Sequence, residues 1–174
     1  MPEQQKREPW LRGTLTEVAV VPRAVLHALE LAREDIARWC GGLSDRELNA
    51  RPAGIAPVAF HIRHIGRSID RLLTYAEGNQ LAPEQLDAMK CELDAGAEHK
   101  TLFAEFADAM GRASARVRAI DATDLDKPRK VGRKELPTTV GGLLVHVADH
   151  TQRHVGQAIT TAKIVMVARG TPKT

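Results

Sequence analysis

The segment VHVADHTQRHVGQ (residues 145–157) spaces three histidines four residues apart, at His146, His150 and His154. In an α-helix, residues four apart lie about 40° from each other around the axis and about 6 Å along it, so two imidazoles can converge on one metal ion. His150 and His154 share their side of this helix with apolar residues, where an unpaired imidazole would lose its hydration on folding. The segment predicts a helix that carries either a metal-binding pair or a histidine-rich polar seam.

The rest of the chain shows the same helical spacing of apolar residues in long segments. We predict four long amphipathic helices, at about residues 22–40, 57–77, 97–120 and 140–166, and a short extra helix at about residues 83–93. Scarce aromatic residues, at 3% of the chain, favour packed helices over a sheet. The fold class expected is therefore all-α, a four-helix bundle with one short additional helix.

Turn-forming residues separate these helices. Gly78 is expected to end the second helix, and Thr138 or Thr139 to cap the fourth. Residues 43–57 and 121–137 are rich in proline and glycine, so both are predicted to be loops, and no strand is expected. Residues 1–13 are expected to form a flexible N-terminal arm and residues 14–174 a single domain.

The composition argues against several functional classes. Twenty-five basic and 22 acidic residues are interspersed along the chain, with a net charge of +3. A nucleic-acid interface would gather basic residues beside aromatic ones, and the basic segment 127–134 is short. No apolar run approaches the length of a membrane span, and the N-terminus lacks the apolar core of a signal peptide. We expect no nucleic-acid or membrane partner and a cytoplasmic location.

A third ligand is available on the second helix. His61 and His64 lie three residues apart in AFHIRHIGRS (residues 59–68), and periodicity alone does not choose between them. His27 and His99 stand alone and are expected to be surface or half-buried packing residues. The direction from the helix axis swings by about 80° between His146 and His154, so His146 is assigned a supporting or packing role.

Two blocks of this sequence resemble the DinB-like superfamily of small metal-binding four-helix bundles. They are LNARPAGIAPVAFHIRHIGRSIDRLLTYAEG (residues 48–78) and HVADHTQRHVGQ (residues 146–157), and the likeness extends over about residues 15–169. The second block is similar to the family signature HxxxH-x-GQ, with His150 and His154 as ligands. In the first block, His64 precedes Gly78 by the interval at which the family's ligand histidine precedes its helix-ending glycine.

This resemblance implies several properties. The bundle would be of up-down-down-up type with one long crossover, assembled as a homodimer. It would hold a divalent transition metal, zinc or nickel most often, on His64, His150 and His154. Relatives in the family include bacillithiol S-transferases and mycothiol-dependent maleylpyruvate isomerase, so a low-molecular-weight thiol is a candidate second cofactor.

A metal on three neutral imidazoles keeps its full charge and is a good Lewis acid, able to activate a thiol or a water. The function expected is a metal-dependent enzyme on small molecules, with thiol S-transferase-like chemistry. The alternatives are a metal-dependent hydrolase and a non-catalytic metal-binding bundle with a structural or stress-sensing role. Whether the protein is an enzyme stays open at this point, and no catalytic residue is assigned.

Further residues near the ligands are candidates for supporting the metal or contacting substrate. They are His61, His146, Gln157 and Arg153. Arg63, Arg67 and Arg71 on the second helix are expected to be solvated charges, with the alternative that one of them binds a substrate carboxylate. Neither Cys40 nor Cys91 belongs to a CxxC motif, and neither is expected to be a nucleophile.

Overall fold

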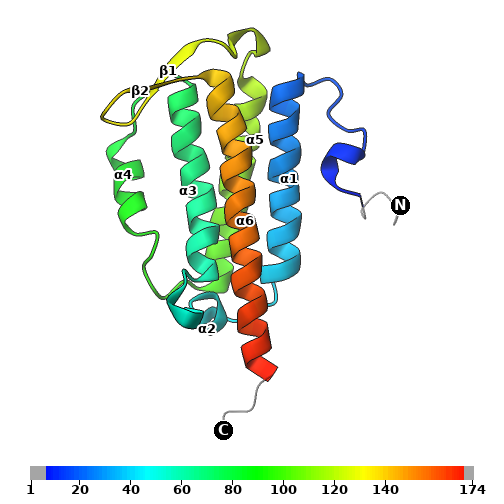
Figure 1. Ribbon diagram of the computed structural model, residues 1–174, viewed down its shortest axis with the longest axis vertical. Helices are drawn as coiled ribbons and strands as arrows, with labels where there is room; N and C mark the ends of the chain where they lie inside the picture. Colours follow the sequence, from blue (N-terminus) through cyan, green and yellow to red (C-terminus); the bar gives the residue numbers. More distant parts are fainter. Residues whose placement is uncertain (1–6, 171–174) are drawn as a thin grey trace.

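The computed structural model describes residues 7–170 and is an all-α bundle of four long helices (Figure 1). In chain order the elements are a 3₁₀ turn at Pro9–Leu11, α1 (Val20–Cys40), α2 (Asp45–Leu48), a 3₁₀ turn at Pro52–Gly54, α3 (Val58–Ala76), α4 (Pro83–Lys90), α5 (His99–Ala119), a 3₁₀ turn at Ala122–Asp124, β1 (Pro128–Val131), β2 (Leu136–Thr139) and α6 (Val140–Gly170). The predicted helices are confirmed, and the predicted loop at residues 43–57 contains α2 and a 3₁₀ turn.

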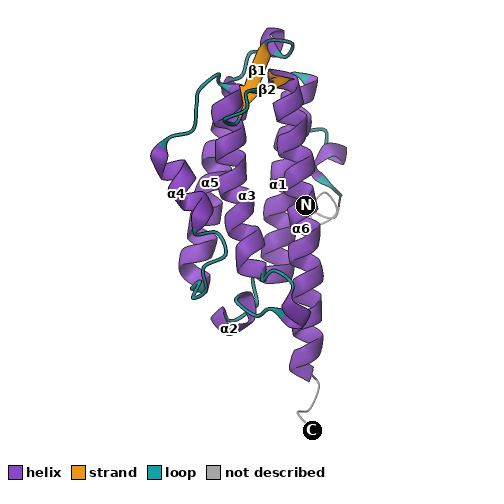
Figure 2. Cartoon of the chain, turned by 60° about the vertical axis from the view of Figure 1, so that its left-hand side comes forward, coloured by secondary structure: helices purple, strands orange, loops and turns teal. Residues whose placement is uncertain are grey.

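The four long helices run as the up-down-down-up topology requires. In Figure 1, α1 and α6 run from top to bottom, and α3 and α5 run from bottom to top. Because α3 and α5 are parallel, residues 77–98 must return along the whole bundle between them. This crossover carries α4 and lies outside the four-helix core, as Figure 2 shows.

The core lies along the axis of the bundle and is almost entirely aliphatic. Each of the four long helices contributes fully buried residues, among them Leu29, Ile36, Ile62, Ile65, Ile69, Met110, Val117, Leu144 and Val147. Burying one such side chain contributes about 1.5–3 kcal/mol, and the set recurs at helical spacing in the sequence. The core therefore forms without any metal ligand.

Local signals set the helix ends near the site. Gly78 has φ +88°, and the amides of Gly78 and Asn79 donate to the carbonyls of Tyr75 and Thr74 at 2.9 and 3.0 Å. This is the left-handed cap that glycine adopts most easily, and it ends α3 where expected. At the start of α6, Thr139 Oγ1 accepts from the Gly142 amide at 3.0 Å, so Thr139 is the cap.

The segment between α5 and α6 corrects the expectation of a simple loop. Residues 128–131 and 136–139 form an antiparallel pair, with Pro128 opposite Thr139 and Lys130 opposite Pro137. Proline is tolerated there because both strands of an isolated pair are edges. Arg129 Nε donates to the Ala76 carbonyl at 2.7 Å, which fastens the hairpin over the end of α3. Tertiary contacts therefore determine the conformation of this segment.

The N-terminal segment lies outside the core and is attached to α1 through Arg12. Arg12 contacts Glu30 and Glu34 of α1 at 2.9 and 2.6 Å, while residues 1–6 of the predicted arm lie outside the described residues. Within residues 7–170, no helix combines the length and the apolar character that crossing a membrane would need.

Candidate metal centre

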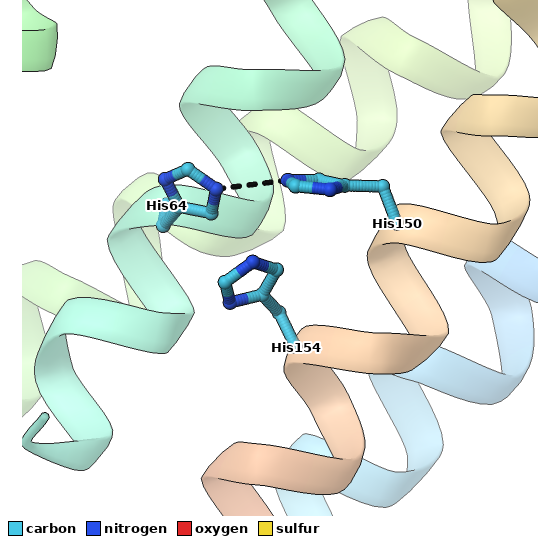
Figure 3. Close-up of side chains that lie close together, drawn as sticks. All are labelled: His64, His150 and His154. Atoms are coloured by element: carbon cyan, nitrogen blue, oxygen red, sulfur yellow. Dashed lines mark hydrogen bonds between the residues drawn. The ribbon is translucent and has the colours of Figure 1, made fainter. Parts of the chain in front are cut away.

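Three histidines from two helices meet on the seam between α3 and α6. His64 comes from α3, and His150 and His154 come from successive turns of α6 (Figure 3). Each offers one ring nitrogen, and these three atoms lie within 4.8 Å of one another. All three side chains are partly exposed, so a ligand held by them stays reachable from solvent. The structure thus brings together the residues expected from the sequence.

The donor set fits a divalent transition metal. Two nitrogens that bind one zinc ion at tetrahedral positions are about 3.3 Å apart, since each Zn–N bond is about 2.05 Å. Nε2 of His64 and Nε2 of His150 lie 2.8 Å apart, so a small rotation of either ring reaches that separation. Imidazole nitrogens suit zinc, nickel, copper and iron alike, so the three histidines can hold a metal whose identity the donor set leaves open.

The environment keeps two of these imidazoles neutral at physiological pH. Burial, followed by the neighbouring charges of the other histidines and of Arg153, lowers the pKa of His150 to about 4. Burial and the same kinds of neighbour lower the pKa of His154 to about 4. A histidine must be in its neutral form to bind a metal, and both side chains are in that form at pH 7.

The carboxylate of Glu92 contacts Nδ1 of His64. Its Oε2 lies 2.6 Å from Nδ1 of His64, and its Oε1 accepts from Nη1 of Arg71 at 2.7 Å. The residue is only 5% exposed. Burial acts to raise the pKa of Glu92, but the hydrogen bonds from His64 and Arg71 outweigh it and leave the pKa below its ordinary value. The carboxylate is therefore ionised and accepts from both partners.

His61 is a fourth, buried histidine beside the three. Its Nδ1 lies 3.1 Å from Nδ1 of His154, and the residue is 5% exposed. Burial, together with His154 and His64, lowers the pKa of His61 to about 4. Phe60 stacks on His64 with ring centroids 5.3 Å apart and covers this end of the cluster. His61 is thus a direct neighbour of the candidate ligand His154.

The other candidate residues lie on the exposed side of α6. His146 is exposed, and its ring centroid lies 5.3 Å from that of His150. Arg153 is exposed and pairs with Asp149 at 2.6 Å. Gln157 is exposed, and among the described residues it makes no hydrogen bond to the three histidines. His146 and Arg153 therefore lie close to His150 on its exposed side.

The remaining histidines and Cys40 are placed away from this chemistry. His27 contacts Thr14 Oγ1 at 3.2 Å, and His99 contacts the Gly41 carbonyl at 2.9 Å. Burial raises the pKa of Cys40 to about 12, which keeps it a thiol and removes it as a nucleophile.

Sequence reasoning missed Glu92 and misjudged the arginines of α3. Arg63 and Arg67 are half-buried and donate to the carbonyls of Asp94 and Ala88 at 2.6 and 2.7 Å, so with Arg71 they attach the crossover to α3. A signal existed in their spacing. Arg71 follows His64 by seven residues and so lies within about 20° of it around the helix, which indicates a shared partner for the two side chains but not its identity.

Comparisons with known proteins agree with this architecture. The model of the DinB superfamily matches residues 28–158, which include all three histidines and the crossover. A solved structure, described as a conserved protein from Enterococcus faecalis, superposes with a TM-score of 0.69 at 19% identity, covering 86% of this chain and 99% of that chain. At this identity the likeness concerns the fold alone. No protein of curated function gave a significant match.

Proposed function

The chain belongs to the DinB superfamily, and from this premise we propose that it is a metal-dependent enzyme on small molecules with thiol S-transferase-like chemistry. In this proposal His64, His150 and His154 hold a divalent transition metal, with zinc or nickel the first candidates. A low-molecular-weight thiol is the proposed cosubstrate. The protein is further proposed to act in the cytoplasm as a homodimer.

The observation that carries the proposal is the convergence of three imidazoles in a partly exposed position between α3 and α6. Structural zinc sites usually close with four protein ligands, often cysteines, whereas catalytic sites use three and keep a position for water or substrate. When bound at such a site, the metal supplies Lewis acidity that lowers the pKa of a thiol or water. The arrangement therefore favours catalysis over a purely structural role.

The chain's own residues would serve this reaction in distinct ways. His64, His150 and His154 would hold the ion, while Phe60 stacks on His64 and the buried His61 contacts His154. In the transfer, the thiol sulfur bonds to an electrophilic carbon, the leaving group departs with the bonding electrons, and the thiol proton passes to solvent. The exposed residues His146, Arg153 and Gln157 are the proposed substrate contacts.

The direct test measures metal content and thiol transfer together. Protein purified without a histidine tag would be reconstituted with zinc or nickel and assayed with a panel of low-molecular-weight thiols and monobromobimane. We expect one ion per chain and metal-dependent transfer, both lost in His150→Ala. His27→Gln is the matched control, since it removes a histidine that contacts Thr14 and should change neither result. No retained metal in the wild-type protein would overturn the proposal.

Hydrolysis is the alternative chemistry at the same ion, and para-nitrophenyl acetate in the same assay tests it.

The third candidate, a non-catalytic bundle, draws support from His61, a buried imidazole within 3.1 Å of His154. If His61 were a fourth ligand, the site would be closed. X-ray absorption of the zinc-loaded wild type and of His61→Leu would distinguish the cases, because only a closed site loses a nitrogen ligand in that variant.

A further inference from the structure

Each of the two carboxylate oxygens of Glu92 has its own partner. Oε2 lies 2.6 Å from Nδ1 of His64 and Oε1 lies 2.7 Å from Nη1 of Arg71. The side chains of Glu92 and Arg71 are 6% and 11% exposed, so water does not compete freely for these bonds. Glu92 belongs to the crossover and Arg71 to α3, so residues from two separate elements meet behind one histidine.

This arrangement determines which nitrogen of His64 carries its proton. An ionised carboxylate can only accept hydrogen bonds, so Nδ1 of His64 must be the donor. Metal binding requires the neutral imidazole, which has one N–H, so in that form Nε2 carries the lone pair. In the metal-free protein that lone pair accepts a hydrogen bond from Nε2 of His150 at 2.8 Å, and a bound metal ion would take the place of that proton between the candidate ligands. The carboxylate thus holds His64 in the tautomer that a metal ion requires.

We propose that Glu92, itself held by Arg71, is a positioning residue that fixes His64 as an Nε2 ligand and sets the affinity of the centre for a divalent transition metal. The inference rests on the proposed metal function. A carboxylate behind a ligating histidine fixes the orientation of the ring and strengthens its basicity, and losing such a partner lowers metal affinity by about 10–100-fold.

The substitution Glu92→Gln separates orientation from simple packing. Glutamine has the same shape, but its amide has one acceptor and one donor side. Arg71 offers only donors, so it takes the amide oxygen and turns the NH₂ group towards His64. Nδ1 must then accept, and the ring proton moves to Nε2, the atom needed for the metal. The variant should therefore disfavour the ligand tautomer while keeping the volume of the side chain.

Two readouts test this on the full chain. Nitrogen-15 NMR of histidine-labelled, metal-free protein at pH 7.5 reports the His64 tautomer, and competition with a chromogenic chelator gives the zinc affinity. We expect Nδ1–H in the wild type and Nε2–H in Glu92→Gln, with zinc affinity lower by about 10–100-fold. The carboxylate of Glu92→Asp again only accepts hydrogen bonds, so we expect Nδ1–H on His64 in this variant, as in the wild type.

Arg67→Met is the matched control for loosening of the crossover. Arg67 fastens the same segment through the Ala88 carbonyl at 2.7 Å but does not contact Glu92. We expect this variant to keep the wild-type tautomer and zinc affinity. An unchanged tautomer and affinity in Glu92→Gln, or an equal loss of affinity in Arg67→Met, would overturn the proposal. If the wild type binds no zinc, the metal function fails, and the metal-free tautomer still decides whether Glu92 orients His64.

Discussion

Helix α3 makes two contacts of opposite character on its two sides. Towards α6 and the crossover it presents His61 and His64, which meet other imidazoles and the carboxylate of Glu92. Towards α5 it presents Gly66, where an added Cβ would lie 2.9 Å from the Cβ of Ala109. The first contact buries polar groups, which costs free energy unless each is hydrogen-bonded. The second relies on close packing of small residues. Site and scaffold therefore occupy different faces of one helix and should respond separately to substitution.

The largest effect is expected from removing a candidate ligand on the α6 side. His154→Ala leaves two imidazoles, and zinc affinity should fall by more than about 100-fold, since even a lost supporting residue costs up to that factor. Far-ultraviolet circular dichroism of the metal-free variant should match the wild type, because the aliphatic core is untouched. Stoichiometric zinc retained by the variant after dialysis would contradict the assignment of His154.

The second largest effect is expected from a substitution on the α5 side, which should lower the stability of the protein without lowering its zinc affinity. Met110 is fully buried in the core, and Met110→Ala should lower the free energy of unfolding by about 2–5 kcal/mol by leaving a cavity. Urea denaturation measures this change, and a chelator titration under native conditions should give the wild-type zinc affinity. A parallel fall in affinity would show that the two faces of α3 are coupled.

Acidification of the metal-free protein should first protonate the histidines of the site and so lower its stability. The pKa values of His61, His150 and His154 are about 4 when folded, against about 6.5 when unfolded. Between these values the unfolded chain binds more protons, so the free energy of unfolding should fall as the pH drops from 6.5 towards 4 and stay constant above that range.

Urea denaturation in the presence of a chelator, at intervals from pH 7.5 to 4.5, measures this slope. His61→Leu removes one of the three groups and should flatten it. Carboxylates act in a lower range: hydrogen bonds from Arg169, then from Ser44, lower the pKa of Glu47 from 4.5 to about 2. A free energy of unfolding that does not change between pH 6.5 and 5 would contradict the burial of neutral histidines.

The smallest expected effect concerns two glycines in helices. Gly111 has nothing within 4 Å of an added Cβ, so Gly111→Ala should stabilise the protein by about 0.5–1 kcal/mol through its helix propensity. Gly66→Ala gains the same propensity but must push α3 away from Ala109, which costs about 1–3 kcal/mol. Thermal unfolding of both variants should therefore give shifts of opposite sign. Equal stabilisation would mean that α3 and α5 are not closely packed at Gly66.

The sequence predicts the helical part of this molecule well and the connections poorly. Periodicity identifies the long helices because each buries one apolar stripe, and it identifies His150 and His154 because both lie on one such helix. Glu92 follows a short helix with no buried residues, so no pattern marks it; its role arises only when the crossover packs on α3. The hairpin at residues 128–139 was missed for the same reason, since contacts with α3 and α6 override its proline and glycine content.

The distances along the chain between these partners have a consequence for the order of folding. Glu92 is 28 residues from His64, whereas His150 is 86 residues away. Because the entropic cost of closing a loop rises with its length, bringing Glu92 to His64 costs less conformational entropy than bringing the α6 imidazoles there. We expect the crossover to dock on α3 before α6 brings His150 and His154 to His64. An ion that binds only when all three histidines have come together would then stabilise the docked position of α6. At a free concentration one hundred times its dissociation constant, the ion would raise the free energy of unfolding by about 2.7 kcal/mol.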